Sequence, residues 1–190
     1  YNLDVFHPQS ELPYTFDNSV NLAHLLVGSE GTLAYFKSLK LKLARLPKHK
    51  VLGVVNFASF YQAMDSAQHI VKLGPTAVEL VDRTMIDLSR NNPAFRKTIE
   101  TALVDAQAKT VDAILLVEFS DDEHAPLLKK LEDLDALMSD LGLPRSVVKM
   151  PDASMQKNLW EVRKAGLNIM MSLKGDGKPV SFIEDCAVPL

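Results

Sequence analysis

The chain has 190 residues, of which 47% are hydrophobic and 24% are charged, and its formal net charge is −3. These values are typical of a soluble globular protein with a substantial core, and the slight acidity argues against a nucleic-acid-binding protein. No apolar run approaches the ~18 residues that a membrane-spanning helix requires. The single cysteine, Cys186, excludes an internal disulfide, and its acidic neighbours predict an unreactive thiol.

The pattern of apolar residues predicts the elements in chain order. After an irregular start, the alternation of Leu39, Leu41 and Leu43 predicts a half-buried strand that ends at Pro47. Apolar runs between turn residues then predict strands over 50–57, 76–82, 111–120, 146–150 and 179–190. Stripes with helical spacing predict helices over 59–74, 83–108 with a break near 91–93, 121–142 and 152–172.

This alternation of strands and helices predicts the fold class. Two β-α-β units with helices between them are typical of an antiparallel or mixed sheet with helices packed on one face. The sequence therefore predicts an α+β fold that is ferredoxin-like in its central part. Neither a low-complexity segment nor a short-period repeat is present in the sequence.

A glycine-containing segment, LLVGSEGTLA over 25–34, interrupts an otherwise apolar run. Glycine adopts positive φ and lets a ligand approach bare backbone, whose N–H groups can point at phosphate or flavin edges. The segment lacks the Lys-Ser/Thr of a P-loop and the spacing of a GxGxxG fingerprint. Two interpretations stay open from spacing alone, a turn with no further role and a cradle for a ligand.

A second segment, LWEVRKAGLNIMM over 159–171, places a cation beside an apolar stripe. On a helix, Arg163 has Trp160 at i−3 and Leu167 at i+4. Such an arginine often packs its stem on the apolar surface and exposes its charge. The alternative is a guanidinium that binds a substrate carboxylate by bidentate hydrogen bonds.

The remaining polar residues predict neither a metal site nor a catalytic carboxylate pair. Strand alternation sends Glu184 and Asp185 to opposite faces, where an ion pair at a sheet edge is the expected role. The five histidines are scattered without metal-ligand spacing, and a Ser-His-Asp arrangement is absent from the sequence: His7, His24, His49, His69 and His124.

Three segments taken together resemble a known family. NLAHLLVGSEGTLAYFKSLKLKLARLP, AVELVDRTM and LWEVRKAG…FIEDCAVPL are similar, in order and separation, to FAD-linked oxidases of the vanillyl-alcohol-oxidase type. The similarity is greatest to the D-2-hydroxy-acid dehydrogenases and the flavin subunit of glycolate oxidase, and above all to the subgroup fused to an iron–sulfur domain.

The resemblance implies a division of the chain and a set of cofactor contacts. Residues 1–47 would be the tail of the FAD-binding domain, and 48–190 the cap or substrate domain, incomplete at its end. The loop residues that would contact FAD are Gly28, Ser29, Glu30, Gly31 and Thr32.

The resemblance also implies substrate ligands. Arg163 matches the family arginine that binds the substrate carboxylate, and Lys178 is the nearest candidate for an assisting lysine. The family's pyrophosphate-binding loops and its histidine motif have no counterpart in this chain. A catalytic residue is therefore not expected within it, and the chain alone is expected to be inactive.

The implied activity belongs to a longer protein. That protein would oxidise a 2-hydroxy acid of the D-lactate, glycolate or D-2-hydroxyglutarate class and pass electrons to an iron–sulfur domain or a quinone-linked carrier. That protein is expected to be cytoplasmic, either free or associated with the inner face of the membrane. The competing hypothesis is a non-catalytic ferredoxin-like module that binds a small ligand or forms a homodimer through open sheet edges.

Overall fold

The computed structural model describes residues 21–41, 43–104, 111–171, 175 and 177. The chain divides into two compact units, Tyr1–Arg45 and Leu46–Leu190, and each is described by itself. The described part of the first unit contains one regular element, the short 3-10 helix η2 (Leu22–Leu25). Its cap is Asn21, whose side chain accepts a hydrogen bond from the backbone N–H of Ala23 at 3.1 Å.

The half-buried strand expected from Leu39, Leu41 and Leu43 up to Pro47 is wrong for the described residues of this segment. Leu39, Leu41 and Leu43 are all largely exposed, and the segment has no strand pairing. An alternating pattern stabilises a strand only where a neighbouring strand takes its hydrogen bonds and a core takes its apolar face. Neither partner is present among the described residues of the first unit.

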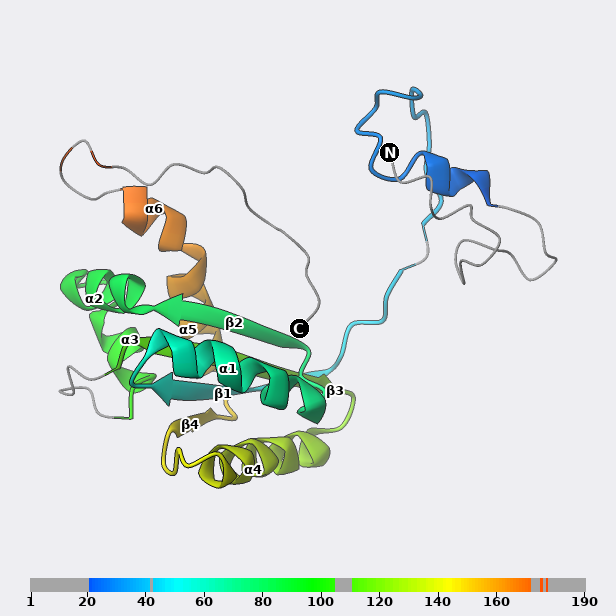
Figure 1. Cartoon of the computed structure of the whole chain (residues 1–190). Coiled ribbons are helices and arrows are strands. Elements are labelled where there is room, and N and C mark those ends of the chain that lie inside the picture. Colours follow the sequence, from blue (N-terminus) through cyan, green and yellow to red (C-terminus); the bar gives the residue numbers. More distant parts are fainter. Residues whose placement is uncertain (1–20, 42, 105–110, 172–174, 176, 178–190) are drawn as a thin grey trace. The chain divides into compact units, whose positions relative to one another are not determined.

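The second unit is built on a four-stranded antiparallel sheet with the order β2-β3-β1-β4 (Figure 1). The strands are β1 (His49–Phe57), β2 (Ala77–Asp82), β3 (Ala113–Asp121) and β4 (Val147–Met150). In this order β1 and β3 are central and β2 and β4 are edge strands, as in ferredoxin-like folds. The predicted α+β class and antiparallel sheet are confirmed.

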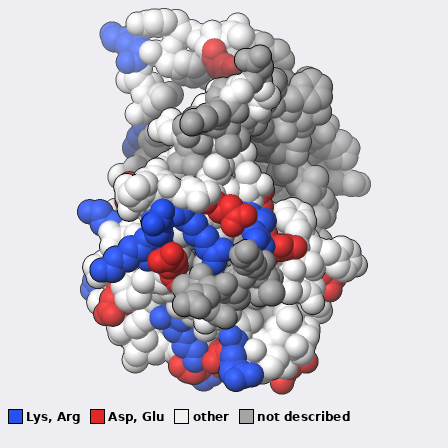
Figure 2. Space-filling model, turned by 90° about the vertical axis from the view of Figure 1, so that its left-hand side faces the viewer, with Lys and Arg blue, Asp and Glu red and all other residues white. Residues whose placement is uncertain are grey.

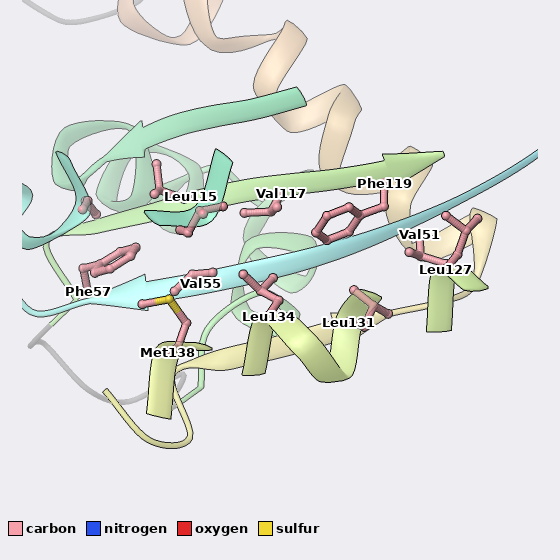
Figure 3. Packing of buried hydrophobic residues seen from close by; sticks show 13 residues of the cluster. Val51, Val55, Phe57, Leu115, Val117, Phe119, Leu127, Leu131, Leu134 and Met138 are labelled. Atoms are coloured by element: carbon pink, nitrogen blue, oxygen red, sulfur yellow. The ribbon is translucent and has the colours of Figure 1, made fainter. Parts of the chain in front are cut away.

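Two helices connect parallel strands of this sheet and cover one of its faces. They are α1 (Phe60–Ile70), continued by the 3-10 turn η3 (Val71–Leu73), and α4 (His124–Asp140). Ser59 caps α1 as predicted, and Gly74 ends η3 with a φ of 69°. Figure 3 shows the core beneath these helices, in which the side chains of α4 point at the sheet: Leu127, Leu131, Leu134 and Met138 against Val51, Val55, Phe57, Leu115, Val117 and Phe119.

The opposite face of the sheet also carries helices, whereas the sequence analysis expected helices to pack on one face only. They are α2 (Arg83–Asn91), α3 (Arg96–Thr101), α5 (Ala153–Lys164) and α6 (Gly166–Met171). The physical reason is that the central strands are apolar on both faces, so each face needs cover. The second core includes Leu52, Val54, Ile114, Leu116, Ile86, Ile99 and Leu159.

A buried glutamine fixes α5 to the sheet. The side-chain nitrogen of Gln156 lies 3.0 Å from the carbonyl oxygens of Lys50 and Met150 and 3.1 Å from that of Pro151. Because Gln156 is almost fully buried, these contacts set the position of the helix against β1 and β4. The last predicted strand, 179–190, lies outside the described residues.

Candidate functional site

The glycine loop consists of two consecutive tight turns in the first unit. The N–H of Ser29 donates to the carbonyl of Leu26 at 3.1 Å, and Gly28 between them has a φ of 77°. The N–H of Thr32 donates to the carbonyl of Ser29 at 2.8 Å, with Glu30 and Gly31 at φ 49° and 76°. Positive φ at both central residues is the geometry of a type I′ turn. The loop is therefore a turn, and its glycines occupy positions where positive φ is required.

Two features of this loop exceed what a plain turn needs. Glu30 holds a left-handed conformation, which costs a non-glycine residue about 1 kcal/mol and tends to occur at functional sites. The hydroxyl of Ser29 is buried, and in the described part of the chain it has no hydrogen-bond partner. Open space also lies above Gly28 and Gly31, since a Cβ atom there would meet no atom within 4 Å.

The arginine lies in the last turn of α5, in the second unit. Its Nε and Nη2 atoms lie 3.2 and 3.1 Å from the same oxygen, Oε2 of Glu79 on β2. Both side chains are about half exposed, so the pair is accessible to solvent. Leu159 and Val162 of the same helix are buried, which directs Arg163 to the outer flank of the helix.

A hollow of about 610 Å³ lies beside α5, at the start of β1 and β2 and the end of β3. Within it, Nζ of Lys50 lies 2.8 Å from Oε1 of Glu118, whose side chain is only 9% exposed. Burial of that carboxylate is tolerated because a lysine neutralises it. Other residues lining the hollow are Pro47, Lys48, Ala77, Ala153, Gln156, Lys157, Trp160, Glu161 and Lys164.

The sequence predicts Arg163 and the loop as candidate site residues, but it does not indicate Glu79 or the Lys50–Glu118 pair, which the structure adds. A signal for Glu79 does exist, because alternation in β2 places it with Ala77 and Val81 on the face that α5 covers. A carboxylate on such a face needs a cationic partner. The other predicted substrate ligand, Lys178, lies outside the described residues.

Several charged side chains elsewhere on the described surface form ion pairs. Figure 2 faces the end of the molecule where α2 and α3 lie in Figure 1, and it shows basic and acidic side chains side by side. Arg83 illustrates this arrangement, since it pairs with Asp87 at 2.8 Å and with Asp112 at 3.4 Å. Among the described residues no group of three or more His, Cys, Asp or Glu side chains could hold a metal ion. The helices described are all too short or too polar to cross a bilayer.

The second unit thus has a ferredoxin-like sheet with a half-exposed arginine beside it, and a glycine turn precedes this unit in the sequence. The family model for FAD linked oxidases, C-terminal domain, matches residues 46–190, and the chain therefore belongs to that family. The resemblance to FAD-linked oxidases seen in the sequence is confirmed.

Individual relatives are dehydrogenases of 2-hydroxy acids. The chain is 30% identical over 171 residues to D-2-hydroxyglutarate dehydrogenase of Pseudomonas putida, covering 89% of this chain and 17% of the relative. It is 28% identical over 188 residues to the Escherichia coli enzyme of that name, covering 94% and 18%. It is 26% identical over 176 residues to the mitochondrial D-lactate dehydrogenase [cytochrome] of Arabidopsis thaliana, covering 90% and 28%. The chain thus spans less than a fifth of the D-2-hydroxyglutarate dehydrogenases.

Proposed function

We propose that this chain is part of a longer flavoprotein that oxidises a 2-hydroxy acid, and that Arg163 binds the carboxylate of the substrate. Membership of the FAD-linked oxidase family supports the cofactor, and the printed names of the relatives support the substrate class. The single observation that carries the role of Arg163 is its exposed guanidinium, anchored to Glu79 along one edge.

The glycine loop is proposed to contact the flavin. The buried, unpartnered hydroxyl of Ser29 is a group that a polar cofactor edge would satisfy. The open space above Gly28 and Gly31 would admit a flat ring against bare backbone. The residues present therefore fit a flavin, with Ser29 and the backbone of 28–32 as the contacts. FAD, when bound, would accept a hydride from the α-carbon of the hydroxy acid.

Arg163 is proposed to orient the substrate. Glu79 occupies the Nε–Nη2 edge of the guanidinium through one oxygen, so the Nη1 side can donate to a carboxylate from solvent. A guanidinium and a substrate carboxylate held at hydrogen-bonding distance would fix the substrate in position. They would thereby set the direction of the C–H bond at its α-carbon. The residue that takes the hydroxyl proton is proposed to lie outside this chain.

Three finer assignments rest on family resemblance. We propose an iron–sulfur domain or a quinone-linked carrier as electron acceptor, a cytoplasmic protein that can associate with the inner face of the membrane, and Lys178 as an assisting substrate ligand. Homodimer formation through open sheet edges is also retained as a proposal.

The test is an anaerobic visible spectrum of the intact protein before and after addition of D-lactate, glycolate and D-2-hydroxyglutarate in turn. Bleaching of a flavin band by one of these acids would support cofactor, reaction and substrate together. A flavin that none of them bleaches would reject the substrate class. A protein that stays colourless after FAD is added would favour the non-catalytic ligand-binding module instead.

A further inference from the structure

The hollow beside α5 has a polar floor. Glu118 on β3 and Gln156 on α5 both line it, and both residues are more than nine-tenths buried. The register of the sheet places Glu118 directly opposite Ala77 on β2 and diagonal to Lys50 on β1. Polar side chains that are buried to this extent usually have all of their hydrogen-bonding atoms satisfied.

Each of these two side chains has one oxygen without a partner in the described part of the chain. The amide nitrogen of Gln156 is fixed by three carbonyl oxygens, at 3.0, 3.0 and 3.1 Å, so its Oε1 points away from them. Oε1 of Glu118 accepts from Nζ of Lys50 at 2.8 Å, whereas its Oε2 accepts no hydrogen bond from a described residue. Neither oxygen is among the described side-chain atoms that are sealed from solvent without a partner, so both are open to the hollow.

These two oxygens require a ligand that donates hydrogen bonds. Acceptors in an open hollow bind water, and a ligand that displaces this water without donating in return loses affinity. A carboxylate or a fully ionised phosphate offers only acceptors and cannot replace the water. Hydroxyl groups can replace it, and an acidic side chain holds ribose hydroxyls in this way in dinucleotide-binding domains.

The rim of the hollow carries an excess of positive charge. Its lining contains the carboxylates of Glu118 and Glu161 and four lysines: Lys48, Lys50, Lys157 and Lys164. Two of the lysines pair with these carboxylates, at 2.8 and 3.1 Å. The other two, Lys48 and Lys157, are exposed and form no ion pair within the described residues. Two positive charges are therefore left over, which favours an anion with a double negative charge.

One wall of the hollow is apolar. Trp160 of α5 is half-buried there, and Pro47, Ala77 and Ala153 also line the hollow. The volume of about 610 Å³ lies within the range of about 300–1,000 Å³ that is typical of small-molecule sites. An isolated anion would leave most of this space unfilled, so a ligand that fits also has a body that packs on the wall.

We propose that the hollow binds a hydroxylated organic phosphate of about the size of a nucleoside monophosphate. Its phosphate, which carries a charge of about −1.5 to −2 at pH 7, pairs with the lysines of the rim. Its hydroxyl groups donate to Oε2 of Glu118 and Oε1 of Gln156, and its body packs on Trp160.

Other occupants fit less well. A cation is opposed by the excess of positive charge, and the two carboxylates in the lining already have lysine partners. An acidic peptide segment satisfies the rim, but its carboxylates offer no donor to the floor. Arg163 and Glu79 are not among the described residues that line the hollow, so the proposal is independent of the proposed activity.

Trp160 provides the measurement, since it is the only tryptophan of the 190-residue chain and lies in the wall of the hollow. Its fluorescence is followed as ribose 5-phosphate or AMP is added at constant ionic strength, with titration calorimetry as a second readout. Three further probes each lack one feature: phenyl phosphate lacks the hydroxyl groups, ribose lacks the phosphate, and inorganic phosphate lacks the body. We expect saturable binding of ribose 5-phosphate and AMP, at least about tenfold tighter than that of the other three.

A variant of the rim tests whether the signal comes from this site. Lys157→Met is expected to weaken the binding of ribose 5-phosphate about tenfold, because a charged hydrogen bond to the phosphate is lost. Lys97→Met, on α3 and outside the lining, is the matched control and should leave the affinity unchanged. Both variants replace an exposed lysine, so both should keep the fold, which circular dichroism checks.

Several outcomes would overturn the proposal. The first is absence of binding in both fluorescence and calorimetry. Equal affinity for ribose 5-phosphate and phenyl phosphate, or equal affinity of Lys157→Met and the wild type, would do the same. Tighter binding of D-2-hydroxyglutarate than of ribose 5-phosphate would also overturn it, because the hollow would then select a hydroxy acid and not a phosphate.

Discussion

Arg163 and Glu79 form an ion pair across the edge of the sheet, with Nη2 of the arginine 3.1 Å from Oε2 of the glutamate. The pair joins the end of α5 to β2, but both side chains are about half exposed. Exposed pairs of this kind contribute about 0–1 kcal/mol to stability. A structural role alone would therefore make Arg163 dispensable, whereas a role in substrate binding would not.

Replacement of Arg163 separates these roles in the intact protein. Arg163→Ala is expected to lower kcat/KM by about a hundredfold or more, because a charged hydrogen-bonded pair with the substrate is lost. Bound flavin should be unchanged. The matched control is Lys164→Ala, which removes a neighbouring exposed cation that pairs with Glu161 and should leave kcat/KM within about twofold.

Exchanging the charges of Arg163 and Glu79 tests the role of Arg163 in a second way. The double variant Arg163→Glu/Glu79→Arg keeps an ion pair in place but moves the cation to β2. We expect activity to stay low, because geometry and not charge alone binds the substrate. Full activity in this double variant, or in Arg163→Ala, would contradict the role assigned to Arg163.

Strain in the glycine loop can be separated from its proposed contact with flavin. Gly31→Ala places a side chain at φ 76°, which costs about 1–2 kcal/mol and fills the space where a ring would lie. We expect the intact variant to lose a large part of its FAD, measured as the ratio of flavin to protein absorbance. Gly74→Ala is the matched control, since its φ of 69° and open surroundings are similar but it lies after η3. Equal flavin loss in both variants would attribute the effect to strain alone.

The buried carboxylate in the hollow predicts a non-additive pair of mutations. Lys50→Met leaves Glu118 nearly buried without its cation and should lower the free energy of unfolding by about 1–3 kcal/mol. Glu118→Leu in addition should restore much of that loss, because the uncompensated charge is then gone. Urea unfolding of the wild type, both single variants and the double variant measures the coupling. Strictly additive costs would show that Lys50 does not stabilise Glu118.

Most of the second unit was predictable from the sequence because its elements carry local signals. Strand β1 is a continuous apolar run, α1 has a capping serine at its start and a glycine after its last turn, and Asn92-Pro93 separates α2 from α3. The pattern did not indicate that helices cover both faces of the sheet. Gln156 of α5 bonds to backbone carbonyls of Lys50 on β1, Met150 on β4 and Pro151 just after β4, and these two strands are far apart in the sequence.

The site was predictable only in part, for a related reason. Gly28, Gly31 and Arg163 are visible from residue type and spacing, since each has a local conformational or helical signature. Glu79 becomes a partner of Arg163 only through the sheet order, which places β2 at the edge beside α5. Around Leu41 the local pattern was present but the strand was not. Alternation of apolar residues leads to a strand only when a neighbouring strand is available to pair with it.

The cluster of Lys149 on β4 with Glu132 and Asp135 on α4 predicts that the stability of the fold depends on pH. Hydrogen bonding to Glu132, and then to Asp135, raises the pKa of Lys149 above its usual 10.5. A raised lysine pKa stabilises the folded state below the unfolded pKa, and this contribution is lost as the pH rises through the folded value. Lys149→Met should cost about 0.5–1 kcal/mol at pH 7, with the difference from wild type shrinking above pH 10.5. Lys129→Met, which breaks the exposed pair with Asp133, is the control and should cost less.

Close packing beneath α4 predicts the effect of a single added methyl group. A Cβ atom on Gly53 would lie 2.5 Å from Cδ2 of Leu134 and 3.4 Å from Cδ2 of Leu131. Leu134 is fully buried and held by its neighbours, so Gly53→Ala should lower the free energy of unfolding by about 1–3 kcal/mol. Combination with Leu134→Val should recover part of this cost, because the clashing methyl is withdrawn, and the coupling is measured by urea unfolding. Gly177→Ala, whose added atom meets nothing within 4 Å, should be close to neutral. A neutral Gly53→Ala would mean that α4 can move away from β1 at no cost, contrary to the packing of this core.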